Sequence, residues 1–182
     1  MTHDELLADV ESDAIIITRE WAMPSRWTFE IKPIQKLLER YEVGIGWIDP
    51  FCGIKSQAEF RNDLDPNNNH ADYHLEAIDF LNLKDWDIQG AVFDPPYSLT
   101  QVSKSYNDIG LQFKGKENPT GGFPKVKKRL SELLKPNQIC ISFGWNTGGL
   151  GKVNNMKIME ILIVPHGGNR NDTLVTVERK LK

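Results

Sequence analysis

Residues 91 to 97 read Ala-Val-Phe-Asp-Pro-Pro-Tyr, and they form the most informative stretch of the 182-residue chain. The three apolar residues predict a buried strand, and the prolines end it because they fix φ and lack a backbone N–H. The turn presents the Asp94 carboxylate, the Pro95 carbonyl and the Tyr97 ring in a stiff arrangement. Acceptors beside an aromatic face suit a flat base with an exocyclic amino group. An ordinary strand-to-loop turn explains the same residues, so the surrounding pattern has to decide.

Helical and strand patterns alternate on both sides of this stretch. Apolar residues spaced i, i+3, i+4 and i+7 predict a helix at 32–42, which begins near a proline and is followed by Gly44. The other predicted helices are 76–83 and 126–134, the predicted strands are 43–48, 58–61, 91–93 and 138–143, and the runs 157–164 and 173–179 predict an antiparallel hairpin. The order predicts an α/β fold with a mostly parallel sheet.

A second segment, Ile48-Asp49-Pro50-Phe51-Cys52-Gly53, lies upstream of the Asp-Pro-Pro-Tyr turn. The two segments resemble motifs I and IV of small phage-type DNA adenine-N6 methyltransferases that depend on S-adenosylmethionine. Residues 62–66 are similar to motif II and 72–81 to motif III, and the run 97–102 and the tail from His166 to Lys180 are also similar to these enzymes. The resemblance spans the chain from about Trp21 onward. It implies a Rossmann-like class I methyltransferase fold with a C-terminal antiparallel hairpin.

The resemblance also implies a binding site for S-adenosylmethionine, with S-adenosylhomocysteine as the product. Ligands of open α/β sheets bind beyond the carboxyl ends of the strands, where the acids of these motifs are expected. The implied cofactor residues are Thr28, Phe29 and Lys32 of a motif X-like segment, Asp49, Pro50, Phe51 and Gly53 near the methionine part, Asp63 at the ribose hydroxyls, Glu76 at the adenine amino group, and Asp94. Plainer roles are helix caps, surface charges and, for Phe29, core packing. Asp72 and Asp79 compete with Glu76 for its role.

Motif I departs from the family pattern. The usual Gly-x-Gly is absent, because Ile54, Lys55 and Ser56 follow Gly53. Few residues remain between Asp49 and Asp63 for a crossover helix, so this connection is expected to be short or irregular. Weak cofactor affinity, or a site completed by a homodimer or a second subunit, follows as an expectation.

The implied catalytic group is Asp94, Pro95, Pro96 and Tyr97. In this hypothesis the target adenine leaves the duplex, Tyr97 stacks on it, and Asp94 and the Pro95 carbonyl accept the N6 hydrogens. Catalysis is then mainly alignment of the amine with the methyl group, without a metal or a nucleophilic cysteine. The alternatives are methylation of cytosine N4, methylation of a protein glutamine, and a non-enzymatic protein that binds DNA or a partner.

Charge is distributed unevenly along the chain. The net charge is −3, but residues 1–97 carry −11 and residues 98–182 carry +8. The predicted DNA-binding residues lie in or beside a Gly/Pro-containing segment, 98–124, which is predicted to be a DNA-contact loop: Lys104, Lys114, Lys116, Lys125, Lys127, Lys128 and Arg129. A solvated helix face and a disordered loop are the alternatives.

The size of the chain suits one methyltransferase domain, 1–182, without a separate target-recognition domain. Apolar runs fall short of the roughly 20 residues that cross a bilayer, so no membrane partner is expected. The acidic N-terminus is unlike a signal peptide, and we expect a protein of the bacterial cytoplasm, encoded by a bacterium or a phage. Cys52 and Cys140 are too few for a four-ligand zinc site and are expected to stay reduced. His166 is expected to be structural, and Trp145 either lines the pocket or packs.

Overall fold

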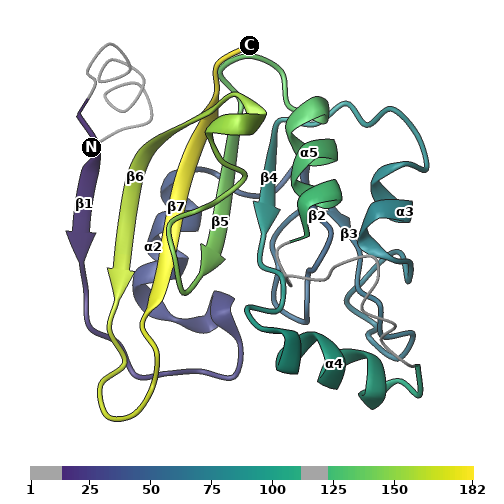
Figure 1. Cartoon of the computed structure of the whole chain (residues 1–182), viewed down its shortest axis with the longest axis horizontal. Coiled ribbons are helices and arrows are strands. Elements are labelled where there is room, and N and C mark those ends of the chain that lie inside the picture. The colour runs from purple at the N-terminus through teal and green to yellow at the C-terminus, as the bar shows by residue number, and fades with distance from the viewer. Residues whose placement is uncertain (1–13, 112–122) are drawn as a thin grey trace.

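The computed structural model describes residues 14–111 and 123–182, and their seven strands form one sheet in the order β1-β6-β7-β5-β4-β2-β3 (Figure 1). The strands are β1 (Ile16–Arg19), β2 (Trp47–Asp49), β3 (Phe60–Arg61), β4 (Gly90–Phe93), β5 (Ile139–Gly144), β6 (Met156–Val164) and β7 (Thr173–Lys180). The pairs β2–β3, β2–β4, β4–β5 and β1–β6 are parallel. Strand β7 is antiparallel to both β5 and β6. The predicted mostly parallel sheet with a C-terminal antiparallel pair is confirmed.

Helices cover both faces of the sheet. The helical elements are η2 (Thr28–Glu30), α2 (Lys32–Arg40), α3 (Ala77–Leu81), α4 (Leu99–Asp108), α5 (Pro124–Leu133) and η3 (Lys152–Asn154). Helix α2 packs on one face, through a cluster that includes Ile34, Leu38 and Val177. Helices α3 and α5 pack on the other face, through a cluster that includes Phe80 and Leu130 (Figure 1).

Strand β4 shows why an apolar run becomes a central strand here. Val92 belongs to the cluster under α2, whereas Ala91 and Phe93 belong to the cluster under α3 and α5. Successive side chains of a strand point to opposite faces, so a strand covered on both sides is apolar throughout. All four residues of β4 are buried, and the strand delivers Asp94 to the carboxyl edge of the sheet.

A buried ion pair joins α2 to β6. Glu160 is almost completely buried, and its two carboxylate oxygens accept bonds from the Arg40 guanidinium at 2.9 and 2.6 Å. The Tyr41 hydroxyl donates a third bond at 2.8 Å. Burial and the neighbouring carboxylate raise the pKa of Tyr41. The arrangement satisfies the charge of Glu160 and connects the helix to the sheet.

Some elements differ from the sequence prediction. Strand β2 begins at Trp47 rather than at Val43, because Glu42 (φ 53°) and Gly46 (φ 78°) form a turn with left-handed backbone. Strand β1 was not predicted. The expectation of a loop throughout 98–124 is wrong for its first part, where α4 forms; residues 112–122 lie outside the described part of the chain.

The shortened crossover is confirmed, since residues 50–59 between β2 and β3 contain no helix. Strand β3 is only two residues long and lies at the edge of the sheet. Within residues 14–111 and 123–182, no helix has the length and apolar character that a membrane span requires.

Candidate functional site

A cavity of about 670 Å³ lies at the carboxyl edge of the parallel strands. Its walls come from the loop after β2, the residues after β3, the start of α3, the turn after β4 and one side of α4. The segment 24–29 and the β6–β7 connection close the other end, and Figure 1 shows these segments gathered below the sheet. A volume of this size is typical of sites for cofactors and other small molecules.

The structure brings most of the predicted cofactor residues together around this cavity. Those that line it are Thr28, Phe29, Pro50, Phe51, Gly53, Asp63, Glu76 and Asp94. Lys32 is exposed at the start of α2 and does not line it. Asp49 is fully buried behind the loop and does not reach the cavity either. Neither of these two side chains therefore lines the cavity in this structure.

Asp49 shapes the loop that follows β2. Its carboxylate accepts bonds from the Phe51 N–H at 3.0 Å and from the Ser56 hydroxyl at 2.6 Å. Burial raises the pKa of Asp49 to about 7, although these two bonds act in the opposite direction. These two bonds hold the loop at residues 50–56 against the end of β2. They support the loop where a crossover helix is absent.

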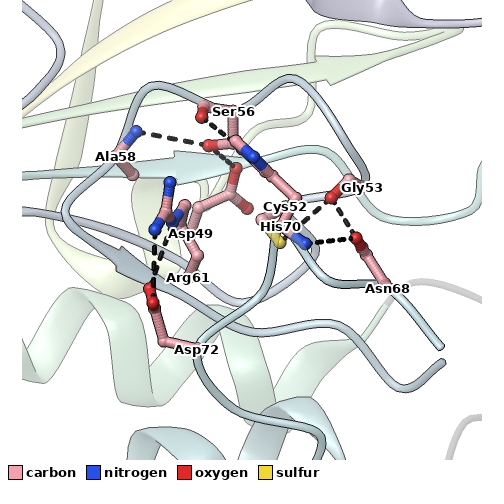
Figure 2. A network of polar contacts seen from close by, with 9 residues as sticks. All are labelled: Asp49, Cys52, Gly53, Ser56, Ala58, Arg61, Asn68, His70 and Asp72. Atoms are coloured by element: carbon pink, nitrogen blue, oxygen red, sulfur yellow. Dashed lines mark hydrogen bonds and ion pairs between the residues drawn. The ribbon is translucent and has the colours of Figure 1, made fainter. Parts of the chain in front are cut away.

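The same loop is held from the other side by two polar residues that the sequence analysis missed. The Asn68 amide donates to the Gly53 carbonyl at 2.7 Å, and the His70 ring contacts the Ser56 carbonyl at 2.8 Å (Figure 2). Gly53 has φ of 51°, and a Cβ there would meet nothing within 4 Å. Gly53 is therefore needed for its backbone conformation rather than for space.

Asn62 connects two loops that line the cavity. Its side-chain amide donates to the carbonyls of Pro50 (3.1 Å) and Leu75 (2.9 Å), and its oxygen accepts from the Leu75 N–H (3.0 Å). Asn62 is 1% exposed, so water does not replace these bonds. Asn62 follows β3 directly and precedes Asp63. The sequence analysis did not single it out, although a polar amide at the end of a predicted strand indicated a role there.

Replacing Asn62 with alanine is expected to lower the free energy of unfolding by about 2 kcal/mol, because buried backbone groups lose their partners. Ligand affinity in the cavity should fall as well, since the loops at Pro50 and Leu75 would separate. Urea unfolding followed by circular dichroism measures the first effect. The matched control is Asn67→Ala, an exposed residue whose side-chain amide donates to Asp65 at 3.1 Å. Equal stability of the two variants would contradict the assignment.

Glu76 faces the cavity at the start of α3. Both of its carboxylate oxygens lie 2.7 Å from the Tyr106 hydroxyl of α4. It makes no side-chain cap bond, so the helix-cap alternative does not hold. Of its competitors, Asp72 pairs with Arg61 outside the cavity, and Asp79 does not line it. Asp63 also faces the cavity, and one of its oxygens accepts from the Asp65 N–H at 2.9 Å.

Asp94 follows the last residue of β4 and lies in the wall of the cavity. It accepts a bond from the Tyr97 hydroxyl at 2.5 Å and another from the Thr28 side chain. Burial raises the pKa of Asp94 to about 6, against the opposing effect of these two donors. The Asp94 carboxylate thus accepts two hydroxyl donors. An ionised carboxylate has acceptor sites for further donors, such as an amino group.

Tyr97 takes a position other than an open stacking surface. Its hydroxyl binds Asp94, its ring packs edge-on against Trp145 with centroids 5.7 Å apart, and its N–H donates to the Gln101 side chain of α4 at 2.6 Å. Burial and the Asp94 carboxylate raise the pKa of Tyr97 well above its usual value. The hydroxyl bond lies near the plane of the ring, and Tyr97 lines the cavity.

The described members of the predicted DNA-binding set differ in their surroundings. Lys104 lines the cavity, whereas Lys114 and Lys116 lie outside the described residues. Lys127 is half-buried over the Phe93 ring at 5.6 Å, and burial lowers its pKa. The remaining three lie on α5 together with Lys127: Lys125 is exposed, Lys128 pairs with Glu132, and Arg129 pairs with Asp85 and Glu132.

The cysteines and His166 have structural surroundings. Cys52 and Cys140 are free and buried, and burial raises the pKa of both thiols. His166 Nδ1 donates to the Ala22 carbonyl at 3.0 Å, and Nε2 lies 2.9 Å from the Thr173 hydroxyl. Among the described residues, no group of three or more His, Cys, Asp or Glu side chains is arranged to hold a metal ion.

Comparison with solved structures places this arrangement in a known fold. TrmN from Thermus thermophilus superposes with a TM-score of 0.53 and 16% identity, over 83% of this chain and 49% of TrmN. The protein has a class I methyltransferase fold. The chain spans about half the length of TrmN. A candidate methylase from Haemophilus influenzae aligns at a TM-score of 0.44 and 13% identity, over 88% of this chain and 92% of that one. No protein-family model and no curated protein matches the sequence.

Proposed function

We propose that the protein is an S-adenosylmethionine-dependent methyltransferase that acts on N6 of adenine in DNA. One observation carries the proposal: the Asp94 turn and the loop at 50–53 face the same cavity, together with Asp63 and Glu76. The fold and this shared cavity put an acceptor for an amino group beside a site of cofactor size.

The residues present fit the proposed cofactor. Asp63 and Glu76 offer carboxylates to ribose hydroxyls and to an adenine amino group, and the Glu76 carboxylate already accepts an O–H donor. S-adenosylmethionine supplies an electrophilic methyl group on a sulfonium centre. The charged walls of the cavity carry both signs: the acids are Asp63, Glu76, Asp94 and Asp108, and the cations are Arg26, Lys55, Lys104 and Arg170.

The role of the turn is to orient the nucleophile. Asp94 and the Pro95 carbonyl accept the two N6 hydrogens, so the nitrogen lone pair points toward the methyl donor. The hydroxyls of Tyr97 and Tyr106 occupy Asp94 and Glu76 in this structure, and the amino groups of substrate and cofactor have to share or replace those bonds. An ionised carboxylate accepts more than one donor, so sharing is chemically reasonable.

The rate of transfer should depend on pH through Asp94. Its raised pKa of about 6 means that the accepting carboxylate is present above pH 6 and is lost as the pH falls below it. We expect the rate to fall about tenfold per pH unit below that point. Initial rates from pH 5 to 8.5, at saturating cofactor and with circular dichroism as a folding control, measure this. A flat profile would exclude an ionised Asp94 as the essential acceptor.

The proposal is tested by expressing the chain in a bacterium without DNA methylation and mapping modified bases by single-molecule sequencing. N6-methyladenine in a short sequence context supports it, and N4-methylcytosine would move the substrate to cytosine. Unmodified DNA, together with no heat of S-adenosylmethionine binding by calorimetry, would contradict an enzyme.

The second candidate is a non-enzymatic protein that binds DNA or a partner. Two observations favour it. Residues 50–59 contain no helix to support the loop beside the cavity, and the hydroxyls of Tyr97 and Tyr106 already donate to the carboxylates of Asp94 and Glu76. The same calorimetric titration separates the two, since a protein that does not bind S-adenosylmethionine gives no binding heat.

A further inference from the structure

We propose that the rim of the cavity, which comprises residues 20–27, Trp145 and residues 165–171, binds unpaired nucleotides that flank the target adenine. This inference rests on the proposed function and adds the state of the nucleic acid. We call residues 20–27 the arm. The surface differs from the predicted basic residues of α4 and α5, because it combines aromatic rings with arginines.

The arm is fixed to the β6–β7 connection by backbone and side-chain bonds. Glu20 N donates to the Ile163 carbonyl at 3.0 Å and Ala22 N donates to the Pro165 carbonyl at 3.2 Å. His166 completes the junction through its bond to the Ala22 carbonyl. These bonds hold the exposed side chains of the arm beside the cavity rather than on a free tail.

Large aromatic and apolar side chains are exposed along this rim. Trp21 is 60% exposed and Met23 is 70% exposed, and the Trp21 ring nitrogen lies close to Gly167 of the β6–β7 connection. Across the turn, Trp145 is 42% exposed beside Tyr97. Trp145 lines the cavity and Trp21 lies beside the β6–β7 connection, and exposed aromatic surface that borders a cavity is typical of interaction sites.

Two arginines supply the charge that a phosphate backbone requires. The Arg26 guanidinium lies over the Trp27 ring, 4.7 Å from its centroid, and both residues line the cavity. Arg170 lines the cavity from the β6–β7 connection. Both are exposed, and neither forms an ion pair with another described residue. Cations free to pair with phosphate, beside ring faces, are the combination found in proteins that bind single strands.

Ring faces decide between unpaired and duplex nucleic acid. The bases of a duplex present only their edges, because their faces are stacked on one another. Trp21, Trp27 and Trp145 therefore gain from bases that have left the stack. The surface is accordingly expected to prefer a single strand, a bulge or a locally opened duplex over intact duplex.

The experiment measures binding of a fluorescent oligothymidylate of about 12 nucleotides by anisotropy, with a duplex of the same length as competitor. This probe contains no adenine, so binding is read separately from methyl transfer. We expect tighter binding of the single strand, and about tenfold weaker binding for Trp21→Ala and for Trp145→Ala. Arg26→Gln should weaken binding and lower its salt dependence.

The matched controls are Val153→Ala and Lys152→Gln in η3, where β6 begins, at the opposite end of that strand from the rim. They should leave affinity unchanged, and thermal melting should confirm that every variant folds. Equal loss in the controls, no loss in the rim variants, tighter duplex binding, or no nucleic-acid binding at all would overturn the inference, the last result favouring a protein partner. If the protein methylates adenine but the rim variants bind oligothymidylate as tightly as the wild type, only the inference about the rim is refuted. Strong oligothymidylate binding without any methylation would refute the proposed enzyme alone.

Discussion

Replacing Asp94 with alanine is expected to lower the rate of methyl transfer to DNA by about a hundredfold or more. Asp94 follows β4 in the cavity wall, where its carboxylate accepts hydrogen bonds from the side-chain hydroxyls of Tyr97 and Thr28. Alanine removes the acceptor that orients the amino group and leaves the loop at 50–53 in place. Transfer of a labelled methyl group to an adenine-containing oligonucleotide measures the rate, and calorimetry with S-adenosylmethionine should give an affinity within about threefold of the wild type.

Two further variants make this result specific. Asp94→Asn keeps one acceptor oxygen and should retain part of the activity. Asp85→Asn makes the same chemical change at a fully exposed acid that pairs with Arg129 on the surface, and it should behave as wild type. Unchanged transfer in Asp94→Ala, or equal effects of both asparagine variants, would refute the role given to Asp94.

Replacing Arg40 with methionine is expected to lower the free energy of unfolding by about 3 kcal/mol. Glu160 is 2% exposed, and the substitution leaves its charge with only the Tyr41 hydroxyl as a donor. Partial exposure of Arg40 places the effect at the lower end for buried pairs. Urea unfolding at neutral pH, followed by tryptophan fluorescence, measures it.

The double variant Arg40→Met with Glu160→Leu tests the cause. It removes both charges, so most of the lost stability should return. Lys128→Met breaks the exposed Lys128–Glu132 pair of α5 and should change the stability by less than about 1 kcal/mol. A double variant as unstable as the single one would mean that packing of the Arg40 stem, rather than the unpaired charge, is responsible.

The central elements were predictable from local sequence. The apolar run ending at Asp94 has to be a strand covered on both faces, and α2 follows from its spacing of apolar residues. Two missed elements also left local signals. Residues 15–18 are a β-branched run that forms most of β1, and Ser98 with Gln101 matches a helix-start pattern, which is realised where Ser98 accepts the Gln101 N–H.

Local sequence was enough to predict which polar groups follow which strands: an acid and two prolines after one buried strand, further acids after other strands, and a hairpin at the end. It placed Asp63, Glu76 and Asp94 at one edge because parallel strands end together. The tertiary structure alone decided that Asp49 turns inward to Ser56, and that Asn62 joins two loops. It also decided that two tyrosines occupy the acids of the cavity. These contacts join residues far apart in the chain or depend on which way a loop folds, and neither hydrophobic period nor spacing carries that information.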